Sequence, residues 1–316
     1  MRNTIIAFII LTISYSCIDD YDLKIKSPER RLVVEGKITN QDGPYFINLS
    51  KSRLQFSFDP FSLNVDTNNL IRWIDGVEMI NDAEVYITDR NENVTDTLIK
   101  SWTLFPNSGN PRDLNLYNGL YQTKKIKGIP GHTYSLKVKW QNQEYHGESF
   151  MPPVPPLDSV QFNFNKGAEG KPDFKIPLLY FKEPKIEQNY YLFITFGLNR
   201  AWPYSILSDE YLKDYVNGLD VCKGISPDYW MTAYPRTNAD GSMDDYFIEM
   251  HSLTQDAYDY YKSLLNQFRT DGGGYSPSPA SPPTNLDNGA LGFFRASSVN
   301  RVDFKREYPN QDIMNP

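Results

Sequence analysis

The sequence predicts a mainly β protein made of two β-sandwich-like domains in tandem, the second carrying one or two short helices and a long loop insertion. Aromatic residues make up 14% of the chain, although its mean hydropathy is only −0.53. That combination suits strands that bury one aromatic face and expose a polar one. Short apolar runs bounded by turn residues recur along the chain, and residues 31–150 show no intervening helical pattern.

The N-terminus is typical of an exported protein. Arg2 precedes the apolar run 5–13, which is far shorter than the roughly 20 residues that span a bilayer. We therefore interpret residues 1–16 as a signal peptide. Ser14-Tyr15-Ser16-Cys17 resembles a lipobox, in which Cys17 would carry the lipid anchor. The alternative is an ordinary secretory signal in which Cys17 is incidental.

An acidic cluster follows the cysteine within the segment 17–30. Its members are Asp19, Asp20 and Asp22. The cluster resembles the signal that sends Bacteroidetes lipoproteins to the outer face of the outer membrane. The alternative is a solvated linker that happens to be acidic. The first interpretation predicts a lipid-anchored protein of the outer membrane that faces the exterior.

Charge and cysteine content exclude two classes of protein. The net charge of −7 argues against nucleic acid as a partner, because phosphate binding needs a concentrated basic face. Once Cys17 is lipidated, Cys222 has no partner within the chain. A disulfide framework is therefore not expected, and the fold has to rest on its hydrophobic core.

Residues 31–150 are predicted to form the first sandwich. In the run 132–140, Tyr134, Leu136, Val138 and Trp140 share one face and polar residues share the other. The remaining strands are expected at 32–39, 45–49 and 83–89. The order of these runs and their turns resembles the transthyretin-like, carboxypeptidase-regulatory type of sandwich. The aromatic stretch 51–80, with Trp73, either packs over this sandwich or forms a contact surface.

The proline-rich segment 151–157 is the expected linker, because its prolines stiffen the chain and remove backbone donors. The second domain is expected to span residues 158–316. Its strands are predicted at 160–164, 174–181, 189–197 and 245–250, the third of them buried on both faces.

One helix is predicted at 253–269, with Ser252 and Gln255 as a capping box. A second, weaker helix is predicted at 208–217. The segment 199–242 is expected to be a loop insertion rich in aromatic residues. Three of them are candidate contacts for a ligand or partner: Trp202, Tyr204 and Trp230.

The last part of the chain carries the most specific resemblance. Residues 285–298 read NLDNGALGFFRASS, after an early LVVEGKIT and the linker MPPVPPLDS. With the lipobox, this order resembles the Bacteroidetes family called domain of unknown function 4249. The resemblance implies an outer-membrane lipoprotein of the kind often encoded beside TonB-dependent receptors. It implies no catalytic residues.

Motifs for catalysis, cofactors and metals are missing from the sequence. The three histidines, His132, His146 and His251, form no HExxH pair. No Ser-x-x-Lys or Gly-x-Ser-x-Gly motif occurs. The oxygen-rich stretch 238–245 has Phe247 where a calcium loop needs glutamate, so we interpret it as a turn. We therefore expect neither a metal, nor a cofactor, nor an enzyme.

The leading hypothesis is a non-catalytic binding module that docks on a TonB-dependent transporter and helps to capture its substrate. One alternative is a surface glycan-binding protein that uses exposed aromatic residues as stacking platforms. A less favoured alternative is a surface hydrolase that uses Cys222 or a pair of carboxylates. The ligand, a glycan or a peptide, is not given by the sequence.

Overall fold

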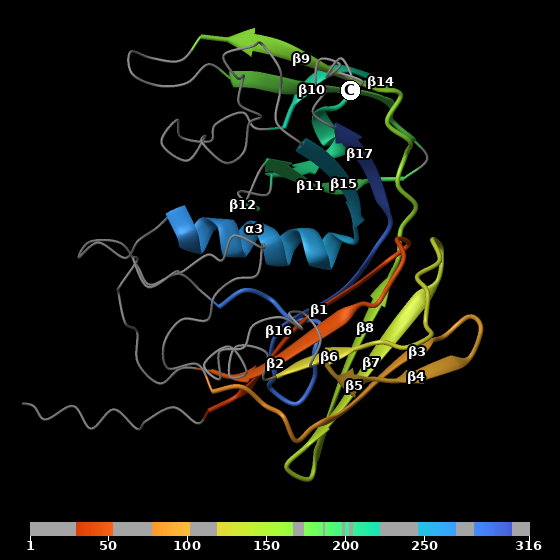
Figure 1. Cartoon of the computed structure of the whole chain (residues 1–316), viewed down its shortest axis with the longest axis vertical. Helices are drawn as coiled ribbons and strands as arrows, with labels where there is room; N and C mark the ends of the chain where they lie inside the picture. The colour runs from red at the N-terminus through yellow and green to blue at the C-terminus, as the bar shows by residue number, and fades with distance from the viewer. Residues whose placement is uncertain are drawn as a thin grey trace, which may run out of the picture.

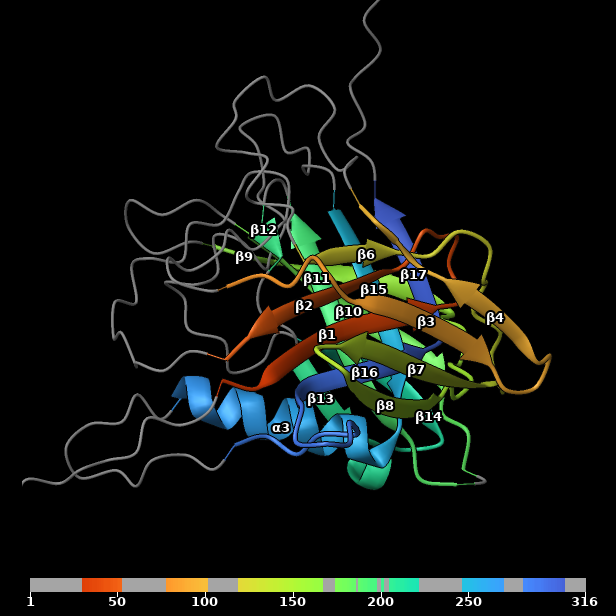
Figure 2. The ribbon, with the colours of Figure 1, turned by 90° about the horizontal axis from the view of Figure 1, so that it is seen from below.

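The computed structural model describes residues 30–52, 78–101, 119–166, 174–185, 187–197, 200–201, 205–221, 246–269 and 281–304. These residues are mainly β and form two lobes, with one long helix between them (Figure 1). Seen from the side of the first lobe, the strands of that lobe lie in front of those of the second (Figure 2). The mainly β class predicted from the sequence is confirmed. No helix within the described ranges is both long and apolar enough to cross a membrane.

The first lobe consists of two packed sheets. One has the strand order β16-β1-β2-β6-β5 and the other has the order β4-β3-β7-β8. The strands are β1 (Leu32–Thr39), β2 (Phe46–Lys51), β3 (Glu84–Asp89), β4 (Val94–Thr97), β5 (Ile99–Lys100), β6 (Leu120–Gln122), β7 (Thr133–Trp140), β8 (Gln143–Phe150) and β16 (Leu291–Ser297). The apolar alternation of β7 points Tyr134, Leu136 and Val138 into the core between the sheets, as predicted.

One strand of this lobe comes from the far end of the chain. β16 pairs in parallel with β1, from Val33 opposite Leu291 to Thr39 opposite Ser297. The sequence assigned residues 158–316 to the second domain, but β16 completes the first sheet and Phe294 lies in the first core. Gly292 permits this pairing, because its φ is +89° and an added Cβ would lie 2.0 Å from the carbonyl oxygen of Val34.

The second lobe has two sheets, β14-β10-β9 and β12-β11-β15-β17, with β13 on a branch beside β11. The strands are β9 (Ser159–Asn165), β10 (Phe174–Lys182), β11 (Tyr190–Gly197), β12 (Arg200–Ala201), β13 (Ser205–Ser208), β14 (Tyr215–Asp220), β15 (Tyr246–Leu253) and β17 (Val299–Phe304). Tyr191 and Phe193 of β11 lie in the core between these sheets, whereas Leu192 faces the helix. The prediction that this strand is buried on both faces is confirmed.

The helix α3 (Gln255–Arg269) confirms the predicted helix, but its start is formed differently. The first helical N–H bond, from Tyr258, goes to the carbonyl of Thr254, and the Thr254 hydroxyl donates to Asp256. Ser252 does not cap the helix. Its hydroxyl donates to the carbonyl of Pro152, 2.5 Å away.

The predicted helix at 208–217 is wrong. Ser208 does cap a turn, but that turn is the single 3-10 turn η2 (Asp209–Tyr211). The chain then extends into β14, because Val216 is buried in the second core. The part of the segment 199–242 that is described therefore contains the strands β12, β13 and β14 and the turn η2 in place of the expected loop.

The two lobes meet where β15 ends and β16 passes into β17. The backbone N–H of Ser252 donates to the carbonyl of Ser298 at 3.0 Å, and the Ser297 hydroxyl donates to the carbonyl of Ser252 at 2.6 Å. The side chain of Asn40, from the first lobe, accepts from the N–H of Val299. Leu192, Leu253 and Ala257 pack there against Phe293 of β16. We call this region the lobe junction.

Candidate functional site

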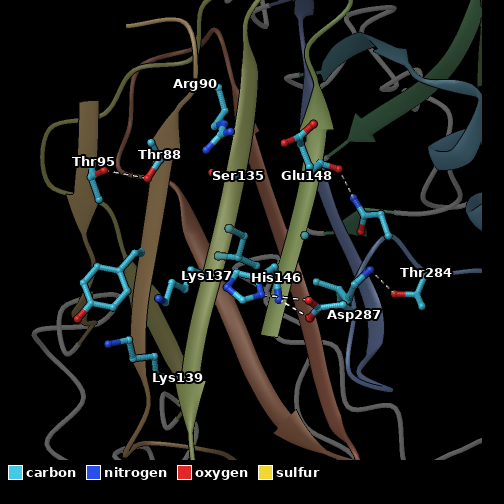
Figure 3. A pocket seen from close by; sticks show the side chains of 15 residues that line it. Thr88, Arg90, Thr95, Ser135, Lys137, Lys139, His146, Glu148, Thr284 and Asp287 are labelled. Atoms are coloured by element: carbon cyan, nitrogen blue, oxygen red, sulfur yellow. Dashed lines mark hydrogen bonds and ion pairs between the residues drawn. The ribbon is translucent and has the colours of Figure 1, made fainter. Parts of the chain in front are cut away.

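A groove of about 1010 Å³ lies on the outer face of the sheet β4-β3-β7-β8 (Figure 3). Its floor is formed by side chains that alternate with core residues along β3, β7 and β8. One side of the groove is a wall formed by residues 284–287, which precede β16 in the chain. The floor is lined by Tyr86, Thr88, Thr95, Ser135, Lys137, Lys139, His146 and Glu148, with Arg90 at one end.

The wall of residues 284–287 is held on β8 by packing and by hydrogen bonds to the backbone. Leu286 is 7% exposed and bridges to Gly147, where an added Cβ would lie 2.8 Å from the Leu286 side chain. The side-chain amide of Asn285 donates to the backbone carbonyls of Glu148 and Phe294, at 2.9 Å and 2.7 Å. The wall therefore joins β8 to β16 and covers the edge of the sheet.

His146 and Asp287 form a polar contact between the floor and the wall. Asp287 accepts from the backbone N–H of His146 at 2.6 Å, and its second oxygen lies 3.0 Å from the imidazole Nδ1 (Figure 3). The carboxylate therefore fixes the ring orientation. The other ring nitrogen, Nε2, lies 3.8 Å from Glu144. No hydroxyl or thiol in the part of the chain that is described bonds to this imidazole.

Cations and hydroxyls dominate the floor. Lys137 contacts Glu144 at 2.9 Å, and this hydrogen bond holds the pKa of the Glu144 carboxyl below its usual range. Lys139 lies between Glu144 and Glu84, at 3.7 Å and 3.8 Å. All these side chains are at least a third exposed, so the ion pairs are solvated and exchangeable.

The floor also carries hydroxyl groups. The hydroxyls of Thr88 and Thr95 are 2.8 Å apart across β3 and β4. The Tyr86 hydroxyl donates to Glu84, and this bond raises the pKa of the phenol. Lys139 lies 5.8 Å from the centre of the Tyr86 ring. Such a surface has donors and acceptors for hydroxyl groups and cations for carboxylates.

His132 and His146 have different surroundings. His132 lies 2.8 Å from Asp89, which holds the turn after β3 by accepting from two backbone N–H groups. It takes no part in the groove, whereas His146 does. Within the residues that the structure describes, no group of three histidine, cysteine or acidic residues is arranged to hold a metal ion.

The candidates named from the sequence lie outside the described residues. They are Cys17, Asp19, Asp20, Asp22, Trp73, Trp202, Tyr204 and Trp230, and Cys222 also lies outside. Sequence reasoning missed the groove. The alternation in the run 132–140 did predict a polar face. The wall of the groove, however, comes from a segment about 140 residues later in the chain, as the hydrogen bond between His146 and Asp287 shows.

Comparison with protein families identifies the same family that the sequence motifs resemble. The model of the family described as "Domain of unknown function (DUF4249)" matches residues 18–302. The chain belongs to this family. The match includes both lobes and the wall of the groove. A comparison with curated proteins found no match.

Proposed function

We propose that this DUF4249 protein is a non-catalytic binding module that holds a polar ligand in the groove of its first lobe. The observation that carries the proposal is the groove itself, which presents hydroxyls and exchangeable cations on rigid strands. Rigid strands hold ligand-contacting groups in place at little entropic cost. The ligand class that fits this lining best is an oligosaccharide bearing carboxylates.

The proposal includes a location and a partner. The lipobox-like Cys17 and the acidic cluster Asp19, Asp20 and Asp22 support a lipoprotein on the exterior of a Bacteroidetes outer membrane. The partner is a TonB-dependent transporter, for which the family resemblance is the support. The two-sheet first lobe supports the transthyretin-like resemblance of its strand order.

The binding experiment uses oligogalacturonate as an acidic probe and maltooligosaccharide as a neutral one. Isothermal titration is performed on the purified chain and on the variant Arg90→Met with Lys137→Met. We expect the acidic probe to bind the unchanged chain and to lose at least tenfold in affinity with the variant. The control is Lys124→Met with Lys125→Met, which removes two exposed lysines that do not line the groove. Equal binding by all three proteins, or none by the unchanged chain, would contradict the ligand assignment.

Location and partner are tested separately on cells. Cys17→Ala is expected to release the chain from the membrane fraction, and replacing the three aspartates with asparagine is expected to protect it from added protease. Cross-linking on intact cells is expected to capture a transporter. Retention of an unacylated chain in the membrane, or the absence of a transporter among the cross-linked products, would refute this part.

A further inference from the structure

The lobe junction contains a buried arginine that pairs with no carboxylate among the residues that the structure describes. Arg295 lies on β16, is 3% exposed, and stands beside Lys37 of β1 in the parallel register. Its Nε and Nη1 atoms are buried and have no hydrogen-bond partner within the described ranges. An unpaired buried charge is unfavourable by several kcal/mol. The guanidinium therefore has donors to offer to a further group.

Aromatic packing holds Arg295 in place but does not neutralise it. Its guanidinium lies 5.2 Å from the centre of the Tyr261 ring on α3. The acids of the neighbouring strands are engaged elsewhere. Glu249 bonds to His251 at 2.9 Å and to Arg301 at 3.1 Å, and Glu35 accepts from Asn48.

His251 of β15 has an unsatisfied nitrogen in the same region. It is 1% exposed, and its Nε2 faces the Glu249 carboxylate. Because a carboxylate only accepts, Nε2 carries the proton and Nδ1 of the neutral ring is an acceptor. Nδ1 is buried and has no hydrogen-bond partner in the part of the chain that the structure describes. Burial chiefly lowers the pKa of His251, to about 4, and the charge of Arg295 adds to this effect against the opposing Glu249 contact.

Strand contacts place these two groups on facing elements. Ser297, two residues after Arg295 and on the same face of β16, donates to the carbonyl of Ser252, which follows His251 directly. β15 and β16 thus contact one another at this point. Lys37 lies opposite Arg295 in the parallel register, and burial, together with the charge of Arg295, lowers the pKa of its ammonium.

We propose that the lobe junction binds a small oxyanion that carries an O–H group, with Arg295 donating to its oxygens and His251 Nδ1 accepting from its hydroxyl. Lys37, opposite Arg295 in the register, adds a further N–H donor. Hydrogen phosphate has both features, whereas sulfate at neutral pH has no O–H. This site is separate from the groove, because none of these residues lines it.

The test measures thermal unfolding of the whole mature chain at pH 7 and constant ionic strength, with chloride, sulfate or phosphate as the anion. We expect phosphate to raise the midpoint with rising concentration, because a ligand that binds only the folded state stabilises it. Sulfate is expected to have less than half of this effect. Arg295→Met is expected to abolish the phosphate effect, and to unfold in chloride at the same temperature or higher, because it removes an unpaired buried charge.

Three comparisons keep the result decisive. Arg90→Met, in the groove, should retain the full phosphate effect. If Arg295→Met does not fold, Arg295→Lys replaces it and should weaken the phosphate response at least fivefold, since one ammonium cannot replace two guanidinium donors. His251→Leu should bring the phosphate response down to the sulfate level. A midpoint that is equal in all three salts, or a phosphate effect that survives both Arg295 substitutions, would overturn the proposal.

Discussion

The groove and the lobe junction use the same residue types in opposite ways. Glu144, beside the groove, contacts three basic side chains, and Glu249, in the junction, contacts two. Glu144 is 46% exposed in its side chain and Glu249 is 10% exposed. Water competes for every contact of the first, and almost none reaches the second. The comparison teaches that burial, and not the number of ion pairs, separates a surface for binding from a structural centre.

The largest expected effect comes from removing β16 from the first sheet. Gly292→Ala places a Cβ against the Val34 carbonyl at a φ that disfavours side chains, so we expect a loss of at least about 3 kcal/mol in unfolding free energy. Gly289→Ala is the matched control. It also has positive φ, but its nearest neighbour is 3.9 Å away, and it should lose about 1 kcal/mol. Urea unfolding measures both, and equal losses would show that the close approach at Gly292 is unimportant.

The place of β16 in the first sheet was not predicted from the sequence, although several other strands were. Local alternation was sufficient for β1, β7 and β11, because one or both faces of each strand are buried in a way the residues display. The partner of β16 was not predictable, because parallel pairing joins Val33 to Leu291 across most of the chain. The burial of Arg295 was not predictable either, because its environment is created by that pairing and by α3.

Local signals also misled where two elements competed for one residue. Ser252 precedes a helix and has the chemistry of a cap, but its hydroxyl bonds to Pro152 and its N–H to Ser298 at the junction. Ser208 does cap η2, yet burial of Val216 ends the helical run. In both cases a tertiary contact outweighed a local preference.

The second prediction compares the two glutamates directly. Glu249→Gln removes the charge that holds Arg301 and His251, and we expect a loss of about 3 kcal/mol, as for breaking a buried ion pair. Glu144→Gln should leave the free energy of unfolding unchanged within error, because its contacts are solvated. Chemical denaturation of both variants at pH 7 decides the matter. If the two losses were similar, burial would not be the distinguishing factor.

The third prediction is a pH dependence that belongs to the junction. His251 has a pKa of about 4 in the folded chain, below its ordinary 6.5. The unfolded chain therefore binds a proton more readily, and the stabilisation is complete above pH 6.5 and declines as the pH falls toward 4, by about 3 kcal/mol at most. Glu249, with its pKa lowered to about 2, contributes in a lower window, between about pH 4.5 and 2.

Urea unfolding midpoints at pH 7.5, 6.5, 5.5 and 4.5 measure the slope of stability against pH. The variant His251→Leu should lose the part of the slope that lies between pH 6.5 and 4.5. His146→Leu, which changes an exposed groove histidine, should keep it. The charged groups around His251 are Glu249 on its own strand, Arg295 on β16 and Lys37 on β1. An unchanged slope in His251→Leu would assign the acid sensitivity to other carboxylates.

Apart from Glu144→Gln, the smallest expected effect on stability is in the groove. Asp287→Ala removes the acceptor for the His146 backbone N–H and ring, yet both side chains are about half exposed. We expect a loss of about 1 kcal/mol or less, since water replaces the lost bonds. Binding of the acidic oligosaccharide should nevertheless change severalfold, because the wall no longer fixes His146.

Leu286→Ala provides the contrast: it removes buried packing against Gly147 and should lower stability more than Asp287→Ala does. If Asp287→Ala left oligosaccharide affinity untouched while the phosphate response of the junction declined, the two regions would be coupled, and treating them as separate sites would be wrong.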